Sequence, residues 1–97
     1  METVVFSLRS LPPGSGPVLA GRLAALLTAR PGAAVVACDV SALDRPCAAD
    51  LDHLARLGLA ARRGGRDFVL RGVGDRLRLL LVLTGFAEVL DGGGAAG

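Results

Sequence analysis

The apolar run AAVVACDV at residues 33–40 limits the choice of fold more than any other stretch of the chain. Apolar residues at successive positions, with Asp39 at the end of the run, are typical of a central strand that is buried on both faces. Before the run, leucines recur at helical spacing in residues 18–30. After it, a second apolar stripe at helical spacing occupies residues 48–63. A strand between two helices predicts parallel strands joined by crossover connections, and therefore an α/β fold.

The N-terminal segment predicts a further strand. In TVVFSLR the apolar side chains of Val4, Phe6 and Leu8 fall on one face, so this strand should bury one face more deeply than the other. The following LPPGSGP has the composition of a turn and leaves room for at most a short additional strand.

The C-terminal half continues the alternation of strands and helices. DFVLR predicts a strand, Asp75 can cap a helix, and Gly85 ends that helix. We expect FAEVL to pack a last apolar turn against the body. The sequence thus predicts one domain at residues 1–90 and a flexible tail at residues 91–97.

Bulk properties exclude several classes of protein. The net charge is only +2, the arginines are spread along the chain and the only aromatic residues are three Phe, so we expect no nucleic-acid partner. The N-terminus lacks the basic region of a signal peptide, and the most apolar run, LLLVLTGF, is too short to span a bilayer. We therefore expect a cytoplasmic protein without membrane insertion, in which the two cysteines stay reduced.

Reactive side chains are too few to predict an enzyme. His53 is the only histidine, and no second histidine or close cysteine pair supplies the spacing of a zinc site. Gly14 and Gly16 are followed by no Gly-Lys-Ser/Thr, and nothing else in the sequence marks a phosphate site. We expect no catalytic residue, no metal and no cofactor.

Two features leave alternatives open. Cys47 near a helix start is either a small packed residue or, because the helix dipole favours thiolate, the reactive group of a thiol-dependent enzyme or redox sensor. Asp39 and Ser41 follow a central strand, where open α/β sheets bind ligands, yet the same two residues also suit a loop cap.

Four segments, taken in order, resemble the STAS domain of bacterial anti-sigma factor antagonists, and the likeness is nearest to short stand-alone actinobacterial members. These segments are VVACDVSAL, ARRGGR, DFVLRGV and LRLLLVLTGFAEVL, and the resemblance covers about residues 4–90. It implies a small mixed sheet of about four strands flanked by about three to four helices. It also implies a non-enzymatic module whose partner is an anti-sigma factor or related kinase-fold protein. In that family the kinase releases its partner by phosphorylating a Ser or Thr at the start of the helix after the Asp-x-Ser strand.

The chain departs from the family at that phosphorylation site. The family motif Asp-Ser-Ser-Gly falls on Pro46, Cys47, Ala48 and Ala49, and no Ser or Thr occurs between positions 41 and 84. Either the protein is permanently in its unmodified, binding-competent form, or an acid such as Asp50 mimics the phosphate.

The resemblance implies that the partner binds the loop after the central strand and the exposed side of the next helix. The residues expected on this surface are Asp39, Ser41, Asp44, Cys47, Asp50, Asp52, His53 and Arg56. An alternative keeps the fold and makes the chain a STAS-type accessory subunit of a transporter or of a larger signalling assembly. We expect a monomer or a weak dimer.

Overall fold

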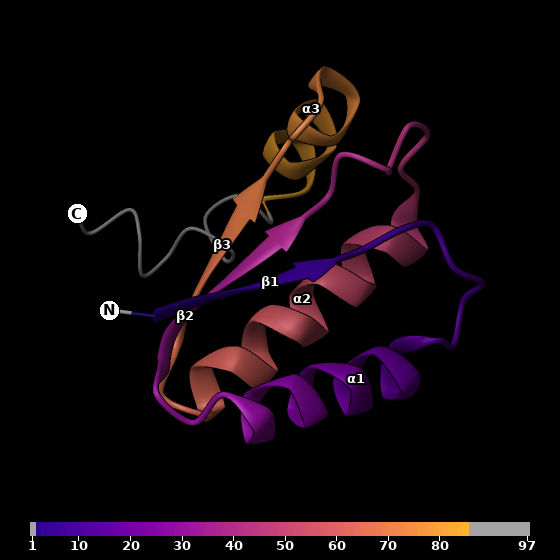
Figure 1. Cartoon of the computed structure of the whole chain (residues 1–97). Helices are drawn as coiled ribbons and strands as arrows, with labels where there is room; N and C mark the ends of the chain where they lie inside the picture. Colours follow the sequence, from indigo (N-terminus) through magenta and orange to yellow (C-terminus); the bar gives the residue numbers. More distant parts are fainter. Residues whose placement is uncertain (1, 86–97) are drawn as a thin grey trace.

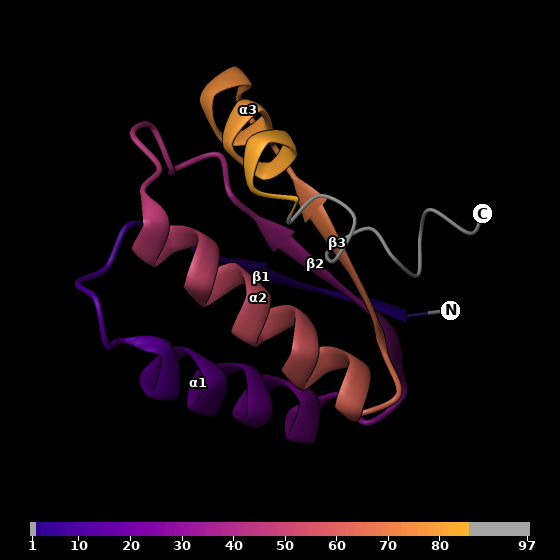
Figure 2. The same cartoon turned by 180° about the vertical axis from the view of Figure 1, so that it is seen from behind.

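The computed structural model describes residues 2–85, which form three strands and three helices in strict alternation (Figures 1 and 2). The elements are β1 (Glu2–Ser7), α1 (Gly16–Ala29), β2 (Ala33–Asp39), α2 (Ala48–Arg63), β3 (Asp67–Arg71) and α3 (Asp75–Thr84). The predicted α/β class is confirmed. The segment FAEVL and the tail at residues 91–97 lie outside the described residues.

The sheet is smaller and simpler than the one expected. Its strands lie in the order β1-β2-β3 and both pairs are parallel, so within residues 2–85 there is neither a fourth strand nor an antiparallel pair. The segment between β1 and α1 forms only a turn, because Pro12 and Pro13 cannot donate to a ladder and Gly14 has a left-handed φ of 90°. The expected mixed sheet of about four strands is therefore not confirmed.

Both α1 and α2 cover the same face of the sheet (Figures 1 and 2). The reason is topological, because two successive right-handed crossovers that add strands in one direction put both helices on one side. Val4 and Phe6 of β1 point to this face and are buried, whereas Val5 between them is 49% exposed. The alternation predicted for β1 is confirmed.

Leucine side chains supply most of the core between the helices and the sheet. α1 buries Leu19, Leu23 and Leu27, and Leu26 is half-buried, so the leucines that recur at helical spacing face the core. In β2 the side chains of Val36, Ala37 and Cys38 are all 0% exposed, as predicted for a central strand. From α2 the core takes Leu51, Leu54, Leu57 and Ala61.

α2 and α3 begin and end close to the positions that the sequence predicts. α2 covers the predicted residues 48–63, and Gly64 and Gly65 follow it. α3 begins at Asp75, but its N-cap is Gly74, so Asp75 is the first helical residue and does not cap. Gly85 ends α3 in the left-handed conformation, at a φ of 77°.

Candidate functional site

The carboxyl ends of the three parallel strands bring polar side chains from separate segments to one edge of the sheet. Ser7, Asp39 and Arg71 are in register across β1, β2 and β3. In many α/β sheets a crevice opens at this edge where the strand order reverses. The order β1-β2-β3 has no reversal, so any site here must be built by loops and side chains.

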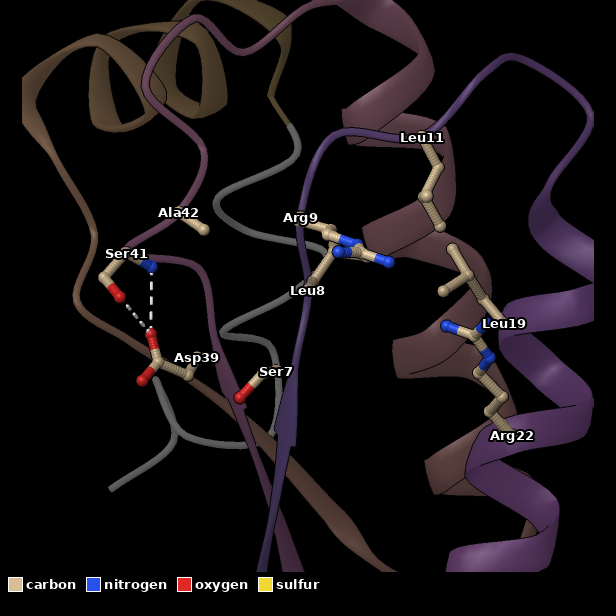
Figure 3. A pocket seen from close by; sticks show the side chains of 9 residues that line it. All are labelled: Ser7, Leu8, Arg9, Leu11, Leu19, Arg22, Asp39, Ser41 and Ala42. Carbon is tan, nitrogen blue, oxygen red and sulfur yellow. Dashed lines mark hydrogen bonds between the residues drawn. The ribbon is translucent and has the colours of Figure 1, made fainter.

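Asp39 and Ser41 form a closed turn at the end of β2. The N–H and the hydroxyl of Ser41 both donate to Oδ1 of Asp39, at 2.9 and 2.7 Å (Figure 3). The pKa of Asp39 is held below its ordinary value, chiefly by the hydrogen bond from the Ser41 hydroxyl and then by the bond from the Ser41 N–H. The charge of Arg71 lowers it a little further, whereas partial desolvation opposes these effects. The two residues thus cap the loop, which was one of the two predicted roles.

Gly72 fits closely against this turn. Its φ is +71°, and a Cβ at this position would lie 2.9 Å from Cβ of Ser41 and 3.4 Å from Oδ1 of Asp39. The N–H of Val40 donates to the carbonyl of Arg71 at 2.9 Å, which ties the turn to the end of β3. The end of β2 is therefore fixed from two sides.

The loop from the turn to α2 keeps an apolar anchor and exposes polar residues around it. Leu43 is buried, whereas Asp44 and Cys47 are exposed. α2 then begins with Cys47 as N-cap, Ala48 exposed and Ala49 half-buried. Positions 47 and 48 therefore lie at an accessible helix start and carry no hydroxyl.

Asp50 does not belong to the exposed side of α2, and our assignment of it to that side is wrong. Its side chain is 1% exposed, and Oδ2 accepts the N–H of Cys47 at 2.9 Å, while Oδ1 has no hydrogen-bond partner within residues 2–85. The spacing explains the burial, because Asp50 precedes Leu54 by four residues and Leu57 by seven. The carboxylate therefore caps its own helix from inside the fold.

The assignment of His53 to the exposed side is also wrong. His53 is 1% exposed, and neither ring nitrogen has a hydrogen-bond partner among the described residues. It lies four residues before Leu57 and so shares the buried face. Asp52 and Arg56 do lie on the exposed face, where Nε of Arg56 donates to Oδ2 of Asp52 at 2.9 Å.

The two cysteines differ in their surroundings. Burial, and to a smaller extent the charge of Asp39, raises the pKa of the Cys38 thiol to about 12, so this residue is an inert part of the core. Cys47 is exposed, and both thiols are free. In the part of the chain from residue 2 to residue 85, no three His, Cys, Asp or Glu side chains are grouped to hold a metal ion.

A cavity of about 430 Å³ opens where β1 ends (Figure 3). It is lined by Ser7, Leu8, Arg9, Leu11, Leu19, Arg22, Asp39, Ser41 and Ala42. The sequence analysis missed Arg9 and Arg22, which lie 13 positions apart and converge only because α1 runs back along the sheet. Arg9 follows the end of β1, whereas Arg22 lies in the middle of α1, so no local signal in the sequence selects the pair.

Comparisons of the chain with protein-family models, with curated proteins and with solved structures find no match. Among the helices described, none is both long and apolar enough to cross a membrane.

Proposed function

We propose that the chain is a non-enzymatic regulatory module of the anti-sigma factor antagonist type, acting in the cytoplasm. The observation that supports the proposal is the arrangement at the end of β2, where a strand ending in Asp39 leads through an exposed loop to the accessible start of α2. A strand ending Asp39-Val40-Ser41 leads into a helix whose accessible first residues are Cys47 and Ala48, where the STAS family carries its phosphoryl acceptor. The proposal includes a STAS-like mixed sheet of about four strands, hence one strand more than the three described.

The proposed partner is an anti-sigma factor or related kinase-fold protein. Its contact surface consists of the loop at residues 40–47, the Asp39–Ser41 turn and the exposed face of α2. Polar side chains on this surface include Asp44, Asp52 and Arg56, and all three are exposed. Asp50 and His53 are left out because each is 1% exposed in the free chain.

The burial of Asp50 supports the permanently binding-competent form over the phosphate mimic. A mimic must present its charge to the partner, but this carboxylate is 1% exposed and is occupied by the N–H of Cys47. A single buried carboxylate also differs from a phosphate that carries about 1.5 to 2 negative charges at an exposed position.

A binding experiment with kinase-fold anti-sigma factors of the same organism tests the proposal. The native chain should bind one of them by calorimetry, and the double charge reversal of Asp44 and Asp52 to Lys should weaken binding by at least about tenfold. Asp67→Lys is the matched control, since Asp67 is exposed at the amino end of β3, away from the proposed surface. If no such protein binds, or if the control weakens binding equally, the proposal fails.

A phosphorylation assay tests whether α2 lacks a phosphoryl acceptor. With the bound kinase and ATP, the native chain should take up no label on α2, because no hydroxyl lies between Ser41 and Thr84. Ala48→Ser restores a hydroxyl at an exposed position and should take up label and release the partner. Label on α2 of the native chain would contradict the proposal.

A further inference from the structure

We infer that the cavity at the end of β1 binds a small molecule that carries an oxyanion, either a carboxylate or a phosphate, at one end and a hydroxyl or amine at the other. Arg9 and Arg22 would hold the oxyanion, and Asp39 would accept a hydrogen bond from the other end. This inference does not depend on the proposed partner protein, although the cavity shares Asp39, Ser41 and Ala42 with the proposed partner surface.

The two arginines make one end of the cavity basic. Arg9 follows β1 and Arg22 lies on α1, and Figure 3 shows both guanidinium groups reaching into the space between these elements. Neither forms an ion pair within residues 2–85, in contrast to Arg30, which pairs with Glu2, and Arg56, which pairs with Asp52.

An oxyanion is the ligand that this end recognises. A guanidinium group presents a planar set of N–H donors that matches carboxylate and phosphate oxygens in a bidentate manner. Two positive groups that share one space repel each other, and an anion between them converts this repulsion into two attractions. Asp39 is the one carboxylate among the residues described as lining the cavity, and Figure 3 shows it on the side away from Arg9 and Arg22, so an anionic ligand would supply the charge that complements the two arginines.

The other end of the cavity carries the opposite charge. Asp39 uses Oδ1 for the two hydrogen bonds from Ser41, whereas Oδ2 has no hydrogen-bond partner within the described part of the chain. The lowered pKa keeps this carboxylate ionised, so it repels an anion and attracts a donor group. The part of the cavity wall that Asp39 forms is therefore acidic, in contrast to the part formed by the two arginines.

The middle of the cavity is apolar and of suitable size. Leu8 and Leu19, which are almost fully buried, lie beneath the cavity, and the half-buried Leu11 offers accessible apolar surface to a short carbon chain. A volume of about 430 Å³ lies within the range of roughly 300–1,000 Å³ that is usual for small-molecule sites. A concave site of this size favours a small metabolite over a flat protein surface.

Titration of the full-length chain with small probes, followed by amide chemical shifts at constant ionic strength, tests the inference. The probes are glycerol 3-phosphate, glycerate, inorganic phosphate and, as a neutral control, glycerol. We expect saturable shifts at residues 9, 22 and 39–42 with at least one of the first two probes, and none with glycerol. A response to glycerol 3-phosphate alone identifies a phosphate ligand, and a response to glycerate alone identifies a carboxylate.

Three variants establish which residues bind. Arg9→Gln and Arg22→Gln should each raise the Kd at least about tenfold. Arg78→Gln, which removes an exposed arginine of α3 outside the cavity, should leave it unchanged. Far-UV circular dichroism checks that each variant is folded.

Asp39→Asn gives a result that general charge attraction cannot produce. It should weaken binding of the hydroxylated probe and strengthen binding of inorganic phosphate, because it removes both an ionic acceptor and a repulsive charge. Absence of a saturable response to every probe, or equal weakening by Arg78→Gln, would overturn the inference.

Discussion

The carboxylate of Asp50 fixes the start of α2 from inside the fold, and its removal is the sharpest test of how this helix is held. Asp50→Ala deletes the acceptor of the Cys47 N–H, which lies 2.9 Å from Oδ2. Asp52→Ala is a matched control two residues later in the same helix, since it deletes the same chemical group from a side chain that is 58% exposed. Both changes alter helix propensity equally, so this effect cancels in the comparison.

The expected magnitude follows from three contributions. A hydrogen bond to an ionised group contributes about 1.5–3 kcal/mol, and an acid in the first turn contributes about 0.3–1 kcal/mol through the helix dipole. Against these, Asp50→Ala removes a buried Oδ1 that has no partner among the described residues, which relieves about 1–3 kcal/mol. We expect a net loss of about 1–2 kcal/mol for Asp50→Ala, in line with the usual cost of losing a helix cap. Asp52→Ala breaks only an exposed ion pair and should cost less than about 0.5 kcal/mol.

Urea unfolding followed by far-UV circular dichroism measures the difference, because the chain has no Trp or Tyr for fluorescence. The slope of the transition should be the same for both variants, so that the midpoints report stability. Equal midpoints would mean that the Cys47 bond contributes nothing. A higher midpoint for Asp50→Ala would mean that burial of the carboxylate costs more than its hydrogen bond returns, and either result would refute the reasoning.

Three further predictions concern the turn at the end of β2 and the thiols. In the same urea experiment Gly72→Ala should lower the free energy of unfolding by about 1 kcal/mol more than Gly65→Ala. Both glycines have a left-handed φ, but only at Gly72 would a Cβ lie within 3 Å of Ser41. Equal losses would contradict the close fit at Gly72. Ser41→Ala should raise the pKa of Asp39, as measured by a carboxyl-carbon NMR titration. Because the pKa is lowered in the folded state, the carboxylate stabilises the fold above its unfolded pKa, and this stabilisation is lost as the pH falls through the folded pKa. An unchanged titration would exclude the role of the hydroxyl. In a thiol-reagent assay Cys47 alone should react in the native chain, with the buried β2 thiol reacting only after unfolding, and two fast thiols would disprove this.

The order and bounds of the elements could be predicted because their signals are local. The bounds of α2 agree with the prediction because local signals mark both ends: Asp50 favours its first turn, Arg62 and Arg63 favour its last turn, and two glycines follow it. The number of strands could not be predicted in this way. The expected fourth strand came from the family resemblance, and the Pro-Pro-Gly sequence that follows β1 permits only a turn.

The candidate site was predicted less well because side-chain environment depends on tertiary packing. Asp50 and His53 were placed on the solvent side by chemical type, although their spacing to Leu54 and Leu57 already put them on the apolar face. Local spacing could therefore have corrected that error. No comparable signal exists for Arg9 and Arg22, whose convergence depends on the direction in which α1 crosses the sheet.

The internal cap of α2 also bears on how this turn can evolve. Because Oδ2 of Asp50 accepts the N–H of Cys47 in a capping box, the start of α2 is held without a hydroxyl at position 47 or 48. Nor does the fold oppose one, since both positions are exposed and Ser is well tolerated at an N-cap. The regain of a modifiable residue at these positions is therefore compatible with the fold. Natural selection can act on the surface chemistry of this turn separately from the architecture beneath it.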